Sequence, residues 1–197
     1  RRHVHHLRAR MDAIMAGVGT VMADDPLLTA RDVPVKRRAR RVVVDPRLRI
    51  STDSTLLRSL GDNGPPVTVA AQETALDSKQ LYRSELEARG VECIAIPEHN
   101  LQTGELALRP LLVHLAERHG ATNVLVEGGA GLFGRMLGQQ LVDQVLVFVA
   151  ARLLGDVKGI LPVSGFSRDR MSQTDMLQLR QVKRIGDDVL LDYACRL

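Results

Sequence analysis

Short runs of β-branched and other apolar residues recur along the chain, separated by segments with helical spacing and by turns rich in glycine or proline. Such runs predict buried strands, and apolar positions three or four residues apart predict helices. The predicted strands are 13–16, 41–44, 67–71, 91–96, 124–126, 144–151, 177–185 and 189–193. The predicted helices or helical turns are 1–12, 20–23, 54–60, 78–89, 106–119 and a segment that follows the strand 124–126.

Strands and helices alternate until the last two strands, which are joined through Gly186 and Asp187 as a hairpin. This order predicts an α/β fold with a mostly parallel sheet flanked by helices and a C-terminal antiparallel hairpin. The strand 144–151 is apolar at nearly every position, so we expect it to be covered on both faces. A chain of 197 residues without a long low-complexity stretch indicates a single domain over 1–197.

One of these strands passes into the next helix through glycines. Gly129, Gly131 and Gly134 have the spacing G-x-G-x-x-G, which leaves backbone N–H groups at a helix N-terminus free to hold a phosphate. Glu127 lies at the carboxyl end of the strand, where α/β sheets present ligand-facing side chains. A glycine-rich turn that only packs tightly is the alternative. The turn comes late in the chain, and the acid expected about 20 residues further on could only be Asp156, so a standard dinucleotide-binding half is not expected.

Much of the net charge of +4 comes from the basic run 36–41. Such a run can be a solvated loop, a nucleic-acid patch or a group of charges that steers a phosphorylated small molecule. The chain has no Trp, two Tyr and three Phe, and these aromatic residues are scattered. Because single-stranded nucleic acids need an aromatic stacking platform, we expect no nucleic-acid partner.

Features of membrane and metal proteins are also missing from the sequence. No apolar run approaches the ~18 residues of a membrane span, and the N-terminus lacks the apolar core of a signal peptide. Cys93 and Cys195 do not form a metal-type pair. His3, His5 and His6 lie close together, but no further ligands with zinc-like spacing accompany them. We therefore expect a cytoplasmic protein that contacts no membrane and holds no metal.

A second group of candidate residues lies near the N-terminus. Thr20 and Asp24 are four residues apart, so a helical turn places the hydroxyl and the carboxylate on one face. Two glycines just before them allow the backbone to approach a ligand closely. The alternative is that the aspartates only end a helix and shape the following turn. Arg8 and Arg31 flank this segment, and either could hold a phosphate through a bidentate contact.

Several segments carry a combined pattern that none shows alone. They are 8–14, 17–31, 41–49, 125–130, 141–143 and 186–191. Read together, they resemble the reductase domain of the riboflavin-biosynthesis deaminase/reductase family, often called RibD. The resemblance implies a dihydrofolate-reductase-like fold, NADPH as cofactor and a homodimer. It also implies that the ribosyl group of 5-amino-6-(5-phosphoribosylamino)uracil, a phosphorylated pyrimidine, is reduced to a ribityl chain.

The resemblance also assigns site residues by matching positions. Those implied to face NADPH are Thr20, Asp24, Gly129, Ala130, Gly131, Leu132, Phe133, Gly134 and Arg135. Those implied to face the substrate are Arg8, Leu28, Arg31 and Glu127. Asp24 is the nearest candidate for a catalytic general acid. The family usually carries a serine where this chain has Pro46, so we expect Arg47 to make more of the contact to the 2′-phosphate of NADPH.

The start of the chain departs from the family pattern. The reductase domain of the family begins with a strand bearing a Ser-Leu-Asp-Gly-like motif, and this sequence starts after it. We therefore expect the domain 1–197 to lack its N-terminal strand. Two other functions stay open, namely a reductase of another pterin or pyrimidine on the same fold, and a non-catalytic nucleotide-binding domain.

Overall fold

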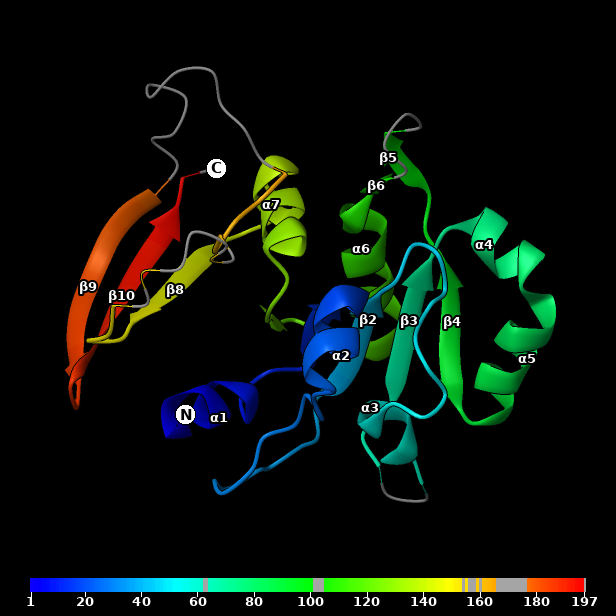
Figure 1. Cartoon of the computed structure of the whole chain (residues 1–197), viewed down its shortest axis with the longest axis horizontal. Coiled ribbons are helices and arrows are strands. Elements are labelled where there is room, and N and C mark those ends of the chain that lie inside the picture. Colours follow the sequence, from blue (N-terminus) through cyan, green and yellow to red (C-terminus); the bar gives the residue numbers. More distant parts are fainter. Residues whose placement is uncertain are drawn as a thin grey trace.

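The centre of the molecule is a parallel sheet. The computed structural model describes residues 1–61, 64–100, 105–153, 155, 159, 161–165 and 177–196. The five strands of the sheet have the order β4–β3–β2–β1–β7, and every pairing between them is parallel. They are β1 (Ala13–Gly17), β2 (Arg40–Val44), β3 (Val67–Ala71), β4 (Val91–Ala95) and β7 (Val124–Val126) (Figure 1). The predicted mostly parallel sheet is confirmed.

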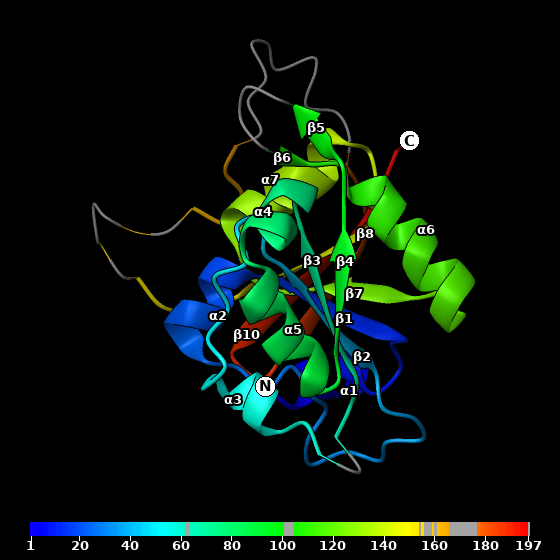
Figure 2. The ribbon, with the colours of Figure 1, turned by 90° about the vertical axis from the view of Figure 1, so that its right-hand side faces the viewer.

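Helices cover both faces of this sheet. One hydrophobic cluster packs against α2 (Val18–Asp24), α3 (Thr55–Arg58), α4 (Glu73–Ser78) and α5 (Gln80–Ala88), and the other against α6 (Leu108–His119) and α7 (Ala130–Gly138). Both faces need cover because successive side chains of β1 point to opposite faces of the sheet. Ile14 packs in the first cluster and Met15 in the second. Figure 2 shows α5 and α6 on opposite sides of the sheet. None of the described helices is long and apolar enough to cross a membrane.

The C-terminal strands form a second, antiparallel sheet. Its order is β8 (Gln144–Val149), β10 (Asp188–Cys195) and β9 (Leu177–Ile185), and the predicted hairpin of β9 and β10 is confirmed (Figure 1, left). The expectation that residues 144–151 are covered on both faces is wrong. Val147, Phe148 and Val149 are 37–48% exposed. An apolar run indicates that a strand meets apolar surface, but not that this surface belongs to the same chain.

Some helix predictions need correction. The helix predicted over 78–89 is α5, and a separate helix, α4, was not predicted; the two are separated at Lys79 (φ −117°, ψ 39°). The Lys79 ammonium donates to the carbonyls of Arg47 and Leu48, at 2.8 and 2.9 Å, and so holds the loop after β2. The helix predicted over 1–12 is the shorter α1 (Arg2–Arg8), which contains no buried residue. The short pair β5 (Glu98–Asn100) and β6 (Glu105–Leu106) was not predicted.

The basic run 36–41 is not simply a solvated loop, because its last two residues begin β2. Arg41 is completely buried. Its guanidinium donates to the carbonyls of Leu56 and Pro65, at 2.9 and 2.5 Å, and to the hydroxyl of Ser59, at 2.5 Å. Burial lowers the pKa of Arg41 to about 10, so the side chain stays charged at neutral pH. The run therefore includes a buried cation that ties β2 to α3 and to the residues before β3.

A carboxylate on β4 gathers several donors around it. Glu92 accepts a hydrogen bond from the hydroxyl of Thr68, at 2.7 Å, and one from the guanidinium of Arg40, at 3.1 Å. The Nε2 atoms of His114 and His119 lie 3.0 and 2.9 Å from its two oxygens. Burial alone would raise the pKa of Glu92, but the hydrogen bonds from Thr68, His114 and His119 outweigh burial and lower this pKa to about 2.

The low pKa of Glu92 predicts how stability depends on acid. The ordinary pKa of 4.5 lies above the folded value of about 2, so folding favours the carboxylate form. The resulting stabilisation is complete above about pH 5 and is lost as the pH falls toward about 2. Urea titrations at several pH values should show a shallower loss of unfolding free energy in Glu92→Gln than in the wild type over this interval. Equal pH dependence in both proteins would contradict the assignment.

Candidate functional site

The turn between β7 and α7 is made by two glycines with left-handed backbones. The φ angles of Gly128 and Gly129 are 70° and 89°, whereas Gly131 and Gly134 lie inside α7. A Cβ atom on Gly128 would lie 2.8 Å from the Cγ2 atom of Thr20. The G-x-G-x-x-G spacing thus predicted the place of the turn, but only its first glycine belongs to the turn itself. The glycines let the turn approach Thr20 on α2 closely.

The first turn of α7 contains backbone N–H groups that have no acceptor within the helix. The N–H groups of Leu132 and Phe133 donate to the carbonyl of Gly129, at 2.9 and 3.0 Å. The two preceding N–H groups, on Ala130 and Gly131, have no intrahelical acceptor because they belong to the first turn. Such a terminus, with its positive dipole end, is suited to an anion.

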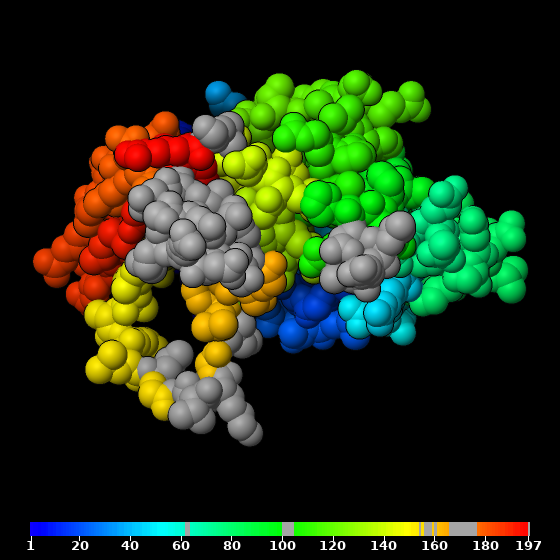
Figure 3. Space-filling model, turned by 90° about the horizontal axis from the view of Figure 1, so that it is seen from above, coloured from blue at the N-terminus to red at the C-terminus, as the bar shows by residue number. Residues whose placement is uncertain are grey.

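A cleft of about 540 Å³ opens beside this terminus, at the carboxyl ends of the parallel strands. Figure 3 looks onto this end of the molecule, where α2 (blue) lies beside α7 (yellow-green). The predicted cofactor residues that line the cleft are Thr20, Arg47, Gly129, Gly131, Leu132 and Arg135. Arg49 and Gln72 line it as well, and the described lining contains no Asp or Glu. Three arginines without an acidic residue in the described lining give this cleft a positive charge that suits an anionic ligand.

The loop after β2 carries two of these arginines, and a buried carboxylate fixes its backbone. Asp45 is completely buried, and its Oδ2 atom accepts hydrogen bonds from the backbone N–H groups of Arg49, at 2.5 Å, and Ile50, at 2.8 Å. Burial raises the pKa of Asp45, and these hydrogen bonds oppose that rise. Leu48 adopts a left-handed backbone, with φ of 49°, to complete the loop. Asp45 therefore fixes the backbone from which Arg47 and Arg49 reach the cleft.

Sequence reasoning missed Arg49 and Gln72. Both follow the carboxyl ends of neighbouring parallel strands, β2 and β3, and the N–H group of Gln72 donates to the carbonyl of Pro46 at 3.1 Å. The edge formed by these strand ends is where open α/β sheets bind ligands. Both residues could therefore have been identified from the sequence as polar residues that follow the end of a predicted strand.

Other predicted cofactor residues lie outside the lining of the cleft. They are Asp24, Ala130, Phe133 and Gly134. Asp24 is the exposed last residue of α2. The next residue, Asp25, has a left-handed backbone and accepts hydrogen bonds from the N–H and hydroxyl groups of Thr55, which agrees with the helix-ending alternative. The catalytic role of Asp24 stays a prediction. Asp156 lies outside the described residues.

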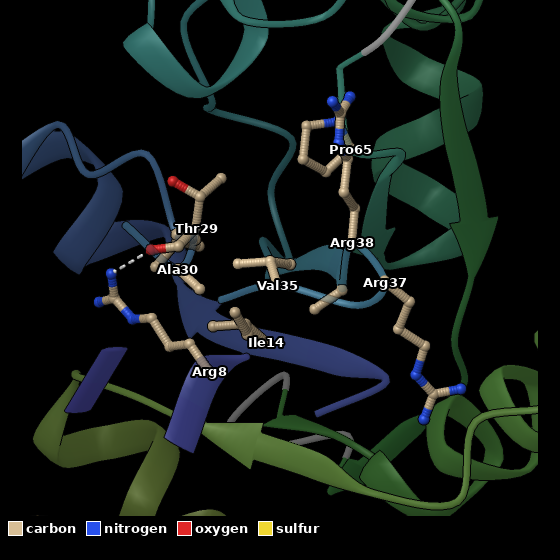
Figure 4. Close-up of a pocket in the computed structure, with 10 residues that line it drawn as sticks. Arg8, Ile14, Thr29, Ala30, Val35, Arg37, Arg38 and Pro65 are labelled. Carbon is tan, nitrogen blue, oxygen red and sulfur yellow. Dashed lines mark hydrogen bonds between the residues drawn. The ribbon is translucent and has the colours of Figure 1, made fainter. Parts of the chain in front are cut away.

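Arg8 and Glu127 form a bidentate ion pair. The Nε atom of Arg8 donates to one carboxylate oxygen of Glu127 at 2.8 Å, and a terminal nitrogen donates to the other at 2.5 Å. The second terminal nitrogen donates to the carbonyl of Thr29 at 2.9 Å (Figure 4). Three of the five guanidinium donors are thus used within the chain. The geometry suits Arg8 to orienting Glu127 more than to holding a phosphate alone.

The remaining predicted substrate residues lie on the segment after α2. Leu28 is 2% exposed and belongs to the hydrophobic core, and its proposed contact with a substrate stays a prediction. It also borders a smaller cavity of about 250 Å³, together with Arg8, Ile14 and Val35 (Figure 4). Arg31 is exposed, and its backbone N–H donates to the Nδ1 atom of His5 at 3.2 Å. Arg31 is therefore the more accessible of the two predicted phosphate ligands.

The fold is that of an α/β protein, with an arginine-lined cleft at the carboxyl edge of a parallel sheet, where open α/β sheets bind ligands. A model of the RibD C-terminal domain matches residues 1–191. The chain therefore belongs to the RibD C-terminal domain family, as the combined segments of the sequence predicted.

Individual relatives agree with this assignment. The riboflavin biosynthesis protein RibD of Actinobacillus pleuropneumoniae is 29% identical over 193 residues, which are 98% of this chain and 48% of the relative. The 2,5-diamino-6-ribosylamino-4(3H)-pyrimidinone 5′-phosphate reductase of Methanothermobacter thermautotrophicus is 32% identical over 197 residues, covering 99% of this chain and 85% of that protein.

A solved structure shows the same fold. The RibD of Acinetobacter baumannii aligns with a TM-score of 0.80 and 27% identity over 100% of this chain and 50% of that chain. The predicted fold class is confirmed by this likeness. The chain spans about half the length of the RibD relatives that it matches.

Proposed function

We propose that this chain is an NADPH-dependent reductase in riboflavin biosynthesis that converts the ribosyl group of 5-amino-6-(5-phosphoribosylamino)uracil to a ribityl chain. The observation that carries the proposal is the cleft lined by Arg47, Arg49 and Arg135 in a member of the RibD C-terminal domain family. The similar protein of Methanothermobacter thermautotrophicus is named as a reductase of a closely related ribosylamino-pyrimidinone phosphate. That name supports a phosphorylated pyrimidine as the substrate class.

The residues of the cleft fit the charged groups of NADPH. The free N–H groups at the start of α7 and the open position at Gly131 suit the pyrophosphate. The guanidinium groups of Arg47 and Arg49 suit the 2′-phosphate, since arginine binds phosphate through paired hydrogen bonds. When bound, NADPH supplies a hydride, which C1 of the sugar accepts in its open, imine-like form. The contribution of the chain is to position both reactants and to balance their charge.

The substrate is proposed to lie beside Glu127. Arg8 binds both carboxylate oxygens of Glu127 and thereby fixes the direction in which this acid meets polar groups of the substrate. Arg31, which is exposed near the same segment, is proposed to bind the substrate phosphate. Asp24 remains the proposed proton donor, since it lies one helical turn beyond Thr20 on α2.

Turnover by the full-length protein that contains this chain tests the proposal. The protein is incubated with NADPH and either 5-amino-6-(5-phosphoribosylamino)uracil or its 2,5-diamino counterpart, and the loss of nicotinamide absorbance is followed. Turnover of either phosphorylated compound supports the proposed substrate class, and the preferred compound shows whether reduction follows deamination. Saturable NADPH binding without turnover of either compound would instead indicate a non-catalytic nucleotide-binding domain.

Removing the charge of Arg31 distinguishes a phosphorylated substrate from a neutral pterin. Arg31→Ala is expected to lower kcat/KM at least tenfold, mainly through KM, because a charge-assisted hydrogen bond contributes about 1.5–3 kcal/mol. Arg118→Ala, at an exposed arginine near the end of α6, serves as the control. A neutral pterin that is reduced equally well by the wild type and Arg31→Ala would favour the alternative reductase.

Arg47 is expected to set the preference for NADPH over NADH. Arg47→Ala removes a charged partner of the 2′-phosphate, so the affinity for NADPH should fall about tenfold while that for NADH changes little. Calorimetric titration of both cofactors measures the change, and Arg49→Ala shows whether the neighbouring arginine shares the contact. An unchanged ratio of the two affinities in Arg47→Ala would remove Arg47 from the 2′-phosphate site.

We also infer a cytoplasmic homodimer. The free thiols of Cys93 and Cys195 are consistent with a reducing compartment. The exposed large apolar side chains of β8 and β9 are Val147, Phe148, Val149, Leu177, Leu179 and Val182. Together they offer apolar surface on one sheet, which a second copy of the chain could cover. Light scattering at micromolar concentration tests the inference, and a monomeric mass would contradict it.

A further inference from the structure

A cluster of potential metal ligands lies at the opposite end of the sheet from the cleft. Glu92 is the second residue of β4, and His114 and His119 come from the last two turns of α6. The side chains of these three residues are 31, 27 and 22% exposed, respectively. They are therefore held in place by the fold and still within reach of an ion from solvent.

The nitrogen atoms of both histidines converge on one oxygen. The Nε2 atoms of His114 and His119 lie 3.0 and 3.2 Å from Oε1 of Glu92, and the three ligand atoms all lie within 4.8 Å of one another. Zinc binds imidazole nitrogen and carboxylate oxygen at about 2.0–2.2 Å in a tetrahedron, which places neighbouring ligand atoms about 3.4 Å apart. Small side-chain rotations would bring these atoms to that spacing.

The second carboxylate oxygen of Glu92, Oε2, lies 2.9 Å from the Nε2 atom of His119 and has two further donors on neighbouring strands. Oε2 accepts hydrogen bonds from the Thr68 hydroxyl at 2.7 Å and from the guanidinium of Arg40 at 3.1 Å. Ligating carboxylates are usually hydrogen-bonded in this way, which fixes their orientation toward the ion. The charge of Arg40 lowers the affinity for a cation, but its guanidinium contacts Oε2, whereas both histidines lie within 3.2 Å of Oε1.

We propose that Glu92, His114 and His119 form a binding site for Zn²⁺, with water completing the coordination. Two histidines and one carboxylate are a common zinc ligand set, and a thiol-poor site of this kind suits a borderline divalent cation. The site joins the amino end of β4 to the C-terminal part of α6, far along the strands from the arginine-lined cleft. The ion would therefore stabilise the packing of α6 on the sheet and take no part in hydride transfer.

Sequence spacing could not reveal this site. The two histidines are five residues apart, and the carboxylate lies 22 residues before the first of them. Only the packing of α6 beside β4 brings the three together. The N-terminal histidines His3, His5 and His6 lie close together in the sequence, so they are a competing source of metal binding in any experiment and have to be removed first.

Binding of Zn²⁺ alone to the whole chain tests the proposal. All proteins carry His3→Ala, His5→Ala and His6→Ala, and zinc is titrated by calorimetry, with a parallel titration of Co²⁺ followed by its visible absorption. One ion per chain is expected, together with a rise in the thermal midpoint and a cobalt spectrum typical of tetrahedral coordination. His114→Ala and His119→Ala should each weaken zinc binding at least tenfold, whereas His99→Ala, at an exposed histidine of β5, should leave it unchanged.

Each other outcome counts against the site. No saturable binding by the background protein would overturn the proposal, as would binding that persists in the double variant of His114 and His119. His119→Gln, at the last position of α6, replaces His119→Ala if the alanine variant unfolds. The acid titrations of Glu92→Gln are made with a chelator present, so the two experiments remain independent.

Discussion

Replacing Arg41 with alanine is expected to lower the free energy of unfolding by about 3 kcal/mol or more. The side chain is completely buried, and three acceptors, on Leu56, Ser59 and Pro65, depend on it. Removing the guanidinium takes a donor from the Pro65 carbonyl and leaves the Leu56 carbonyl with the Ser59 hydroxyl as donor. A buried polar group left unsatisfied costs about 1–3 kcal/mol. The vacated volume adds a further loss. Urea denaturation followed by circular dichroism measures the change.

Two comparisons separate the hydrogen bonds of Arg41 from its bulk and its charge. Arg38→Ala removes an exposed arginine of the same basic run and should change stability by no more than about 0.5 kcal/mol. Arg41→Met keeps most of the volume but none of the donors, so it should recover only part of the loss. Full stability in Arg41→Met would mean that packing, and not hydrogen bonding, explains why an arginine is buried at the start of β2.

Gly131→Val is expected to weaken NADPH binding at least tenfold, which corresponds to about 1.4 kcal/mol. In the protein alone, a Cβ atom at this position would meet only the end of the Arg135 side chain, at 3.4 Å, and the hydroxyl of Ser164, at 3.9 Å. Arg135 can move aside, so the variant should fold. The new side chain would occupy space at the α7 N-terminus that the pyrophosphate needs. Fluorescence titration with NADPH measures the affinity.

Gly61→Val is the matched control for this variant, because nothing lies within 4 Å of a Cβ atom at that glycine and it does not line the cleft. Its NADPH affinity should equal that of the wild type. If a folded Gly131→Val protein keeps the wild-type affinity, the glycine-rich turn serves packing alone, and the pyrophosphate site has to be sought elsewhere.

Local sequence signals predicted the central sheet well, because each of its strands is a short apolar run that can be recognised from neighbouring residues. Val42 to Val44 and Val67 to Ala71 are short apolar runs bounded by turn residues, and they are buried between two layers of helices. The C-terminal hairpin was also predictable, because Gly186 and Asp187 separate two β-like runs. In the structure Gly186 adopts the left-handed backbone that such a turn requires. Such features depend on residues that are neighbours in the chain.

Features that depend on distant neighbours were not predictable in the same way. The apolar strand β8 is the example in the fold, because its composition did not show that it would join a separate sheet with an exposed face. The helix α4 was not predicted either, and Lys79, which follows it, donates to two carbonyls of the distant loop after β2. Both features involve contacts between segments that are far apart in the chain.

The candidate site shows the same division. Thr20 and the glycines of the turn were found because glycine spacing and a hydroxyl one helical turn from a carboxylate are local patterns. The pairing of Arg8 with Glu127 joins residues 119 positions apart, so the sequence suggested both as ligands and not as partners. Arg49 lies in the segment 41–49 of the combined pattern but was not assigned to the site, and both it and Gln72 line the cleft because they follow strand ends.

The place of β1 between β2 and β7 has a consequence for how the protein is made. Ala13 of β1 pairs with Val124 of β7, so the two walls of the cleft come from opposite ends of a long stretch of chain. Closing so long a loop costs conformational entropy before the contacts between its ends form, so we expect this pairing to form late in folding. A growing polypeptide therefore lacks the cleft until α7 has emerged from the ribosome. A nucleotide that spans both walls would then act as a clamp, adding about 2.7 kcal/mol at a hundredfold excess over its Kd.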